Sequence, residues 1–280
     1  MNKSAILKNI NRCLSPRHIL AIAACIFFAS SAFGHTLYIQ SSRYHVHEGK
    51  QSPLFFCYGH HIPVSDGLRA KKLNNIKVHT PQGAVREIDI RDETSLHSYM
   101  VDYDTPGTYV LTAETNPGYY TIYIDKKGRE HHVIKPKNRV KDKAQKIITS
   151  LYCNQYTKTY VVCDTPSPKF PARVGLPLEL VPTKDISTLK PGETLELTVW
   201  SNGKPFNGEG SWDASYNGYS TEAEEMFYKK TTVANGETLK VPITQSGRWF
   251  IRYSTNIDAT GKALNACNQL KQAASLVFQF

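Results

Sequence analysis

The segment Thr194-Leu195-Glu196-Leu197-Thr198-Val199-Trp200 alternates leucine and valine with mostly polar side chains. This period of two puts the aliphatic side chains on one face of an extended chain, which is the pattern of a half-buried strand. The turn-forming run Leu189-Lys190-Pro191-Gly192-Glu193 precedes the segment, and Asn202-Gly203-Lys204-Pro205 follows it. A strand between two tight turns predicts β structure in this part of the chain.

Similar short runs recur on both sides of this segment, rich in apolar, aromatic and β-branched residues. They are Ser52–Tyr58, Tyr99–Tyr103, Gly107–Thr112, Tyr119–Ile124 and Gly247–Tyr253. The turn signature Asp104-Thr105-Pro106-Gly107 joins two of them and predicts a hairpin. Many short strands with Gly and Pro turns favour sandwich folds. We therefore predict an all-β protein with two β-sandwich units of immunoglobulin-like or transthyretin-like type, over residues 35–127 and 174–280.

The stretch between these two units has a different composition. Nine Lys or Arg residues fall within Lys126–Lys146, with few apolar positions and no clear period. We predict that residues 128–173 form a basic, partly helical linker, with a short helix near Ala144–Leu151. An anionic-surface patch or a docking site for a partner is the alternative interpretation. Nucleic acid is not an expected partner, because the chain has the features of an exported protein.

Those features lie in the first 34 residues. The basic residues at the start are Lys3, Lys8, Arg12 and Arg17. An apolar run, Ile19–Phe28, and the small-residue stretch Ala29–Gly34 follow. This is the three-part pattern of a secretory signal peptide, and its apolar core is too short to span a bilayer. We predict cleavage after Gly34 and a periplasmic protein without a membrane span; a retained anchor and lipidation at Cys25 are the alternatives.

Removal of this segment changes the formal net charge from +10 to about +6 and leaves four cysteines. An even number of cysteines in an exported chain favours disulfides, with three pairings open. We predict a Cys153–Cys163 disulfide that closes a short polar hairpin loop, which would leave Cys57 to pair with Cys267. No C-x-x-C spacing is present, so a cysteine metal site is not expected.

Cleavage after Gly34 would make His35 the first residue of the mature protein. Its α-amine and its own imidazole would then form a chelate of two nitrogen donors, which suits nickel, cobalt, copper or zinc. An α-amine has a pKa of about 8, so it is available to a metal at neutral pH. The sequence thus predicts a site for a divalent metal ion that depends on where the signal peptidase cuts.

A second group of histidines lies in Cys57-Tyr58-Gly59-His60-His61-Ile62-Pro63, where a strand ends in a turn. Ligands often lie on such loops, supported by a rigid sheet. Adjacent histidines point apart on an extended chain, so we expect only one of His60 and His61 to join His35 at the same ion. Surface histidines without a metal are the alternative interpretation.

His45 and His47 form a third group, two residues apart and therefore on one face of a strand. This arrangement could chelate a metal ion, and it is also typical of a solvent-facing strand edge. The pair His131-His132 lies among Lys and Arg residues that would repel a cation. His79 and His97 have the pattern of isolated surface or strand residues.

No motif of a known enzyme class is present: there is no G-x-S-x-G, no phosphate-binding Gly loop and no H-E-x-x-H. We therefore expect a binding protein and not an enzyme. One enzymatic alternative is an N-terminal histidine brace, as in copper-dependent polysaccharide monooxygenases, with His60 as the second histidine. Another alternative is a non-metal extracellular interaction module in which the histidines have no ligand.

Three features give the chain a resemblance to a known family. They are Phe33-Gly34-His35 after the signal peptide, the turn Gly59-His60-His61-Ile62-Pro63, and a distal series of Gly175–Pro182, Gly203-Lys204-Pro205 and Gly247–Ile251. With these residues the chain resembles the periplasmic nickel/cobalt-binding proteins, long catalogued as a domain of unknown function and often encoded beside energy-coupling-factor metal transporters.

The resemblance implies a fold of two β-sandwich units and extracytoplasmic binding of Ni²⁺ or Co²⁺ for uptake, with an inner-membrane metal transporter as a partner. His35 and His60 are the positions that match the presumed ligands of that family. The turn departs from the family pattern, because His61 and Ile62 separate His60 from the proline. Copper-resistance carriers also combine a small sandwich with a mature N-terminal histidine, so a periplasmic Cu²⁺-binding protein is the alternative.

Overall fold

The computed structural model describes residues 35–60, 62–92, 98–220, 222, 225–234 and 236–280. Strands dominate this part of the chain, and the helices found in it are four 3-10 turns of three to five residues. The prediction of an all-β protein is therefore confirmed. Residues His35–Phe280 form one compact unit. Among the described residues, no helix has the length and apolar character needed to cross a membrane.

The strands are β1 (Thr36–Ser41), β2 (His45–Val46), β3 (Lys50–Gly59), β4 (Leu73–His79), β5 (Val85–Glu87), β6 (Ser98–Tyr103), β7 (Gly107–Thr115), β8 (Gly118–Asp125), β9 (Glu130–Val133), β10 (Ala144–Cys163), β11 (Leu178–Pro182), β12 (Thr194–Ser201), β13 (Lys204–Pro205), β14 (Gly210–Tyr216), β15 (Tyr228–Val233), β16 (Leu239–Pro242), β17 (Arg248–Asp258) and β18 (Gln269–Gln279). The 3-10 helices are η1 (Ala70–Lys72), η2 (Lys137–Arg139), η3 (Ile186–Thr188) and η4 (Gly261–Asn265).

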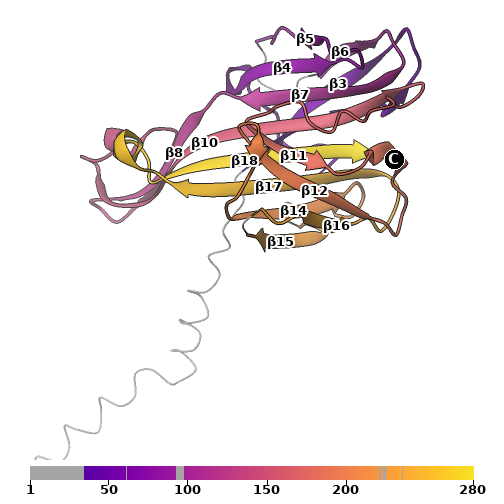
Figure 1. The fold of residues 1–280 in the computed structure, drawn as a ribbon. Coiled ribbons are helices and arrows are strands. Elements are labelled where there is room, and N and C mark those ends of the chain that lie inside the picture. Colours follow the sequence, from indigo (N-terminus) through magenta and orange to yellow (C-terminus); the bar gives the residue numbers. More distant parts are fainter. Residues whose placement is uncertain (1–34, 61, 93–97, 221, 223–224, 235) are drawn as a thin grey trace, which may run out of the picture. The chain divides into compact units, whose positions relative to one another are not determined.

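Strand β10 is central to an eleven-stranded sheet whose main path runs β15-β14-β17-β18-β10-β7-β4-β5. Its 20 residues pair antiparallel with β8 along the first half and with β7 near the end. On its other edge it pairs in parallel with β18. Figure 1 shows this long strand between β7 and β18. β2 and β9 complete the sheet by pairing with β10 and β8.

Two smaller sheets cover opposite faces of the large sheet. One contains β1, β3 and β6, and the other contains β11, β12, β13 and β16. Successive side chains of a strand point to opposite faces. On β10, Tyr156 and Tyr160 accordingly enter the hydrophobic core under the four-stranded sheet, whereas Val161 and Cys163 enter the core under the three-stranded sheet.

Strand β1 is buried along all six of its residues, because both of its faces are covered. Leu37 and Ile39 belong to the core that β1 shares with β3 and β6. Between them, Tyr38 points the other way and packs on Phe250 of β17, with ring centroids 4.6 Å apart. The start of β1, next to His35, is thus held by the small sheet and the large sheet together.

The predicted helix at Ala144–Leu151 is wrong, because these residues form the first part of β10. β8 provides hydrogen-bonding partners along this stretch, from Ala144↔Asp125 to Leu151↔Tyr120. Ile147, Ile148 and Thr149 are β-branched and therefore favour a strand. A linker was predicted because nine Lys or Arg residues and few apolar ones fall within Lys126–Lys146, directly before and at the start of this strand. A large part of residues 128–173 is instead a strand of the main sheet.

The predicted Cys153–Cys163 disulfide is also wrong, because both residues lie on β10. At about 3.3 Å per residue, ten residues of strand separate their Cα atoms by about 33 Å, whereas a disulfide requires less than about 7 Å. All four described cysteines, Cys57, Cys153, Cys163 and Cys267, are free thiols, so the pairing of Cys57 with Cys267 is not formed either. Burial raises the pKa of each thiol.

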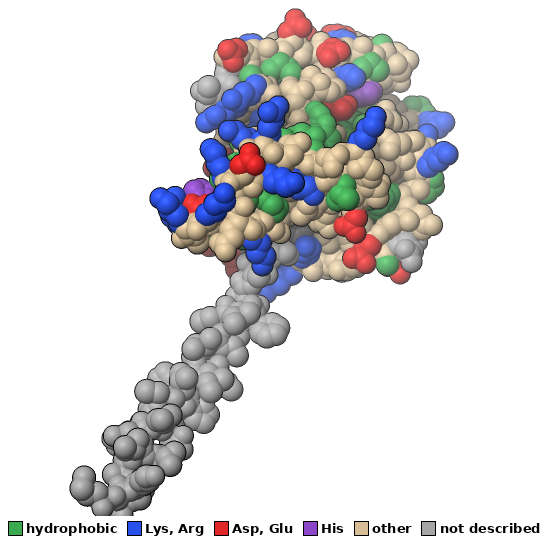
Figure 2. Space-filling model, turned by 90° about the vertical axis from the view of Figure 1, so that its left-hand side faces the viewer, with side chains coloured by type: hydrophobic (Ala, Val, Ile, Leu, Met, Phe, Trp, Pro, Cys, Tyr) green, Lys and Arg blue, Asp and Glu red, His purple; other side chains and the backbone are tan. Residues whose placement is uncertain are grey.

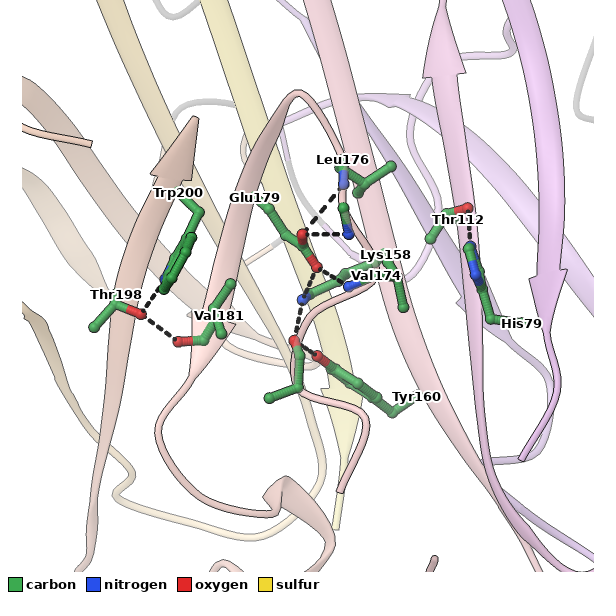
Figure 3. A network of polar contacts seen from close by, with 12 residues as sticks. His79, Thr112, Lys158, Tyr160, Val174, Leu176, Glu179, Val181, Thr198 and Trp200 are labelled. Carbon is green, nitrogen blue, oxygen red and sulfur yellow. Dashed lines mark hydrogen bonds and ion pairs between the residues drawn. The ribbon is translucent and has the colours of Figure 1, made fainter. Parts of the chain in front are cut away.

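A buried ion pair holds the segment between β10 and β11 in place (Figure 3). The ammonium Nζ of Lys158 lies 2.7 Å from Oε1 of Glu179, and both side chains are 1% exposed. Lys158 also donates to the carbonyl of Ala172. The carboxylate of Glu179 accepts the backbone N–H groups of Val174, Gly175 and Leu176. Burial lowers the pKa of Lys158 to about 8, against the attraction of Glu179.

Candidate metal centre

The start of β1 and the end of β3 bring two of the predicted ligands together. Thr36 pairs with Gly59 in the register of these strands. His35, directly before β1, and His60, directly after β3, therefore lie next to each other at the same end of the small sheet. Their ring centroids are 4.8 Å apart, with an angle of 61° between the ring planes. Residues 25 positions apart in the sequence thus line one site.

The His35 side chain is held by a carboxylate and an aromatic ring. Its Nε2 lies 2.7 Å from Oδ2 of Asp66, and its ring stacks on Tyr58 at a centroid distance of 5.4 Å and an angle of 13°. Asp66 is positioned by its own backbone, because its carbonyl accepts the N–H of Tyr58 at 3.0 Å. A carboxylate accepts and cannot donate, so it selects the ring form of His35 with a proton on Nε2.

The backbone of His35 is anchored independently by Gln155 of β10. The side-chain amide of Gln155 donates to the carbonyl of His35 at 2.9 Å and accepts the N–H of Leu37 at 2.5 Å. Its amide nitrogen also lies 3.4 Å from the Tyr58 hydroxyl. These contacts hold the chain at His35 against β10.

His60 has a different environment, because it is 8% exposed and lies above a buried ion pair. Nη1 of Arg252 lies 3.2 Å from its Nδ1. The same guanidinium donates from Nε and Nη2 to the two carboxylate oxygens of Asp213, at 2.7 and 2.6 Å. A guanidinium can only donate, so Nδ1 of His60 is the acceptor and the neutral ring carries its proton on Nε2.

Charge at the site is mixed. Lys72 lies with its Nζ 4.1 Å from the centroid of the Tyr58 ring, on the same aromatic side chain that stacks with His35. Burial lowers the pKa of Lys72, and the neighbouring Arg69 acts in the same direction. The side chains of His35 and Asp66 are 44% and 72% exposed, so solvent reaches this half of the site. The half formed by His60 and Arg252 is closed.

The other predicted ligands lie elsewhere. His45 and His47 both bind Asp164, one through its backbone carbonyl at 3.0 Å and the other through its carboxylate at 2.8 Å. β2 pairs with the end of β10 at Val162–Cys163, seven residues or more beyond Gln155. At about 3.3 Å per residue, this group is more than about 20 Å along the strand from the anchor of His35. His61 falls outside the described residues.

The other histidines that the structure describes also have local partners. His131 bonds Asp125 at 2.8 Å, and His132 bonds Glu130 at 2.7 Å. His79 on β4 contacts the hydroxyl of Thr112 at 3.3 Å. Desolvation lowers the pKa of His79, and the positive charge of Lys77 acts in the same direction. His97 falls outside the described residues.

The sequence patterns did not identify three side chains of the site, Asp66, Asp213 and Arg252. Asp213 and Arg252 do leave a signal, because each is a charge inside an apolar run, Trp212-Asp213-Ala214 and Ile251-Arg252-Tyr253. Buried charges are rarely found without a partner, so two such positions predict each other. Asp66 leaves no such signal, since it follows a turn like many surface carboxylates.

Within the described part of the chain, no group of three or more His, Cys, Asp or Glu side chains is arranged to hold a metal ion. The cluster of His35, His60 and Asp66 therefore does not amount to a complete ligand set of side chains. The fold and the site define an all-β protein in which two histidines and a carboxylate gather where the first described strand begins.

The chain belongs to the family described as a domain of unknown function (DUF4198), whose pattern matches residues 32–256. No curated protein matches it. Among solved structures, it is similar to Escherichia coli alpha-2-macroglobulin activated by porcine elastase, at 11% identity and a TM-score of 0.23, over 88% of this chain and 20% of that one. It is also similar to a DUF4785 family protein from Legionella pneumophila, at 11% identity and a TM-score of 0.21, over 77% of this chain and 51% of that one. At these TM-scores neither likeness supports a conclusion.

Proposed function

We propose that the protein, after removal of residues 1–34, binds one divalent transition metal ion, Ni²⁺ or Co²⁺, in the periplasm in support of metal uptake. The observation that carries the proposal is the bond between Nε2 of His35 and the Asp66 carboxylate, at 2.7 Å. Metal-binding histidines commonly donate their second ring N–H to a carboxylate, which fixes the ring and raises its basicity. In this proposal the protein is a binding protein that passes its ion to an inner-membrane transporter, and not an enzyme.

With its proton on Nε2, the ring of His35 presents the lone pair of Nδ1. This is the ring nitrogen nearer the backbone, and therefore the one that can share a metal ion with the α-amine of the same residue. The amine is not a side chain, and it exists only after cleavage at Gly34. It supplies the ligand that the described side chains lack. The amine and imidazole nitrogens suit Ni²⁺, Co²⁺ and Cu²⁺.

His60 would join the ion as a further ligand under one condition. Its Nδ1 lone pair is directed at Arg252, and its Nε2 carries the ring proton. A metal would bind Nε2 only if the proton moved to Nδ1, which then could no longer accept from Arg252. Metal binding at His60 is therefore coupled to a turn of its ring or a shift of the Arg252 side chain.

The experiment compares two forms of the protein by native mass spectrometry and calorimetric titration with Ni²⁺, Co²⁺ and Cu²⁺. One is the exported protein, whose intact mass establishes its first residue. The other is the uncleaved precursor, in which the same nitrogen is a peptide amide. We expect the exported form to begin at His35 and retain one ion, and the precursor to bind much more weakly. Equal binding by the two forms, or a mature protein that begins elsewhere, would contradict the proposal.

Matched variants test the ligands. His35→Ala should abolish stoichiometric binding, because it removes half of the chelate. His60→Ala should weaken binding by about 10- to 100-fold. His79→Ala is the control, and it should leave affinity unchanged. Equal losses in all three variants would show that the metal has no defined site. Cu²⁺ is expected to bind more tightly than Ni²⁺ at nitrogen ligands, so metal content after growth, rather than affinity, separates the nickel/cobalt function from the copper-carrier alternative.

The proposal keeps two β-sandwich units as the interpretation of the architecture, with the metal site in residues 35–127 and a second unit in residues 174–280. Two of the three buried hydrophobic clusters support it, one under β1, β3 and β6 and one under β11, β12 and β16, while the third, around Tyr38 and Phe250, joins the two parts. Hydrogen exchange would test it: two units should show two distinct levels of protection.

A further inference from the structure

One end of the large sheet extends as an arm, which we define as residues 118–152 and 255–271. It contains β8, β9, η2 and the first half of β10, together with the end of β17, η4 and the start of β18. In Figure 1 it lies at the left, where β8 and the turn between β17 and β18 are seen side by side. None of its residues belongs to the candidate metal centre.

The arm carries the positive charge of the protein. It has eleven Lys or Arg residues and four Asp or Glu residues, a formal net charge of +7, whereas the rest of residues 35–280 has nineteen against twenty. Eight of the nine basic residues between 126 and 146 are exposed: Lys126, Lys127, Arg129, Lys135, Arg139, Lys141, Lys143 and Lys146. Figure 2 views the molecule from this side, and Lys and Arg side chains are spread over it.

Exposed aliphatic side chains lie among these charges. Eight large hydrophobic residues are exposed in the described part of the chain, and four of them are in the arm. They are Ile134, Ile148, Ile257 and Leu264, at 77%, 46%, 45% and 50% exposure. Ile134 follows β9 directly and lies next to Lys135, and Leu264 lies in η4 two residues from Lys262. Burial of such side chains away from water is favourable and would stabilise a complex.

The two parts of the arm are fixed to each other. The backbone N–H of Lys137 donates to the carbonyl of Ala266 at 2.8 Å, and its Nζ donates to Oδ1 of Asn268 at 2.6 Å. Asn268 in turn donates its N–H to the carbonyl of Ser150 at 2.7 Å. The basic loop and the η4 turn thus form one surface. Among the acidic groups of the arm, Asp125 is bound by Arg129 and His131, and its charge is included in the net +7.

We infer that this arm docks the protein onto an anionic lipid surface, with lysines at the headgroups and the exposed isoleucine and leucine side chains at the acyl boundary. Clusters of Lys and Arg near a membrane attract anionic lipids, and apolar side chains beside them add buried area. Nine of the eleven basic residues are Lys. Lys is depleted in protein–protein interfaces, where Arg is enriched, so this composition favours lipid over an acidic protein. The inference is independent of the proposed metal site.

Vesicle flotation with the exported protein tests the inference. Vesicles of phosphatidylethanolamine with phosphatidylglycerol are compared with vesicles of phosphatidylcholine alone, at low and high salt. We expect binding to the anionic vesicles that falls steeply with salt, and little binding to the neutral ones. The variant Lys126→Glu/Lys127→Glu/Lys141→Glu/Lys143→Glu should bind the anionic vesicles at least about a hundredfold more weakly. Equal binding to both vesicle types would overturn the inference.

A matched control reverses four exposed lysines outside the arm, in the variant Lys50→Glu/Lys169→Glu/Lys204→Glu/Lys229→Glu. It has the same change in net charge, and it should keep most of the vesicle binding. Equal losses in the two variants would show an effect of net charge alone and overturn the assignment to the arm. Ile134→Ser/Leu264→Ser should weaken binding several-fold, with Val85→Ser/Met100→Ser as its exposed apolar control. If the wild type ignores vesicles and binds polyglutamate, the partner is an acidic protein and the lipid inference is wrong.

Discussion

Two ion pairs are buried in the described part of the chain, one on each face of the large sheet, and they differ in what surrounds them. Lys158 and Glu179 are each 1% exposed, and Arg252 and Asp213 are each 2% exposed. The first pair lies under the four-stranded sheet beside Tyr156 and Tyr160. The second lies on the face of β17 that carries Phe250, against β1 and β3.

The Lys158–Glu179 pair is closed by backbone groups. Its remaining hydrogen bonds go to the carbonyl of Ala172 and to three N–H groups of the segment before β11. The Arg252–Asp213 pair forms between directly opposed residues of β14 and β17. Its guanidinium still has a donor directed at His60. The first pair therefore fixes the segment between β10 and β11, whereas the second positions the ring of His60, a candidate metal ligand.

The largest effect on stability is expected from Glu179→Gln. It leaves the Lys158 ammonium buried without its counter-charge, which costs about 3–5 kcal/mol. Urea unfolding would measure this change, with Glu193→Gln in the exposed pair with Lys184 as a control that should change little. The double variant Lys158→Met/Glu179→Gln should recover part of the loss, because no buried charge then remains. A double variant less stable than the single one would contradict this account.

The variant Asp213→Asn tests whether the Arg252–Asp213 pair, unlike the Lys158–Glu179 pair, affects metal binding. It should destabilise the fold by about 3 kcal/mol, because Arg252 loses its charged partner. It should also weaken metal binding by about 10-fold or more, because Arg252 and His60 are no longer held in place. Glu179→Gln, by contrast, should leave the metal affinity of the folded protein unchanged. Titration calorimetry of both variants, below their unfolding temperatures, makes the comparison. The same loss of affinity in both would mean that His60 depends on general stability only.

The two buried pairs should differ in how they make the free energy of unfolding depend on pH, because one contains lysine and the other arginine. Lys158 has a pKa of about 8 in the folded protein, and about 10.4 is usual for an unfolded chain. Between these values the unfolded state binds more protons, so the free energy of unfolding rises with pH, by at most about 1.4 kcal/mol per pH unit. Arginine guanidinium groups are not deprotonated in proteins, so no such slope is expected from an ion pair built on arginine.

Urea unfolding of the wild type and of Lys158→Met, between about pH 8 and about pH 10, tests this slope. The wild type should gain stability relative to the variant as the pH rises. A relative loss would mean that Glu179 keeps Lys158 charged in the fold.

The smallest effect on stability is expected from Asp66→Asn. Its carboxylate is largely exposed, and exposed ion pairs contribute little. Metal affinity should nevertheless fall by about 10-fold or more, because His35 loses the carboxylate that fixes its ring. Asp102→Asn, another exposed carboxylate, is the control in the same titration. Unchanged metal affinity in Asp66→Asn would show that the contact between His35 and Asp66 does not support metal binding, and would contradict the proposed function.

Local pattern determined the class of this protein. Alternation in Thr194–Trp200 predicted a strand that the structure contains as β12. The turn residues Asp104–Gly107 do join two strands, but the predicted hairpin is wrong, because β6 pairs with β3 whereas β7 pairs with β4 and β10 in the large sheet. Side-chain periodicity is a property of consecutive residues, so it is visible without a structure. The histidine pattern indicated His35 and His60 together with His61, His45 and His47, and the role of any of them as a metal ligand stays a prediction.

Only the tertiary structure decided the rest. The stretch Ala144–Leu151 became a strand because β8 provides its hydrogen bonds, and the same strand continues from Leu151 with β18, which lies more than a hundred residues away in the chain. Cys153 and Cys163 are kept apart by the length of that same strand. The contact between Arg252 and His60 joins residues 192 positions apart, since β1 and β3 pack on the face of β17. Strand pairing and the burial of charge depend on which distant segments meet, and no local period encodes that.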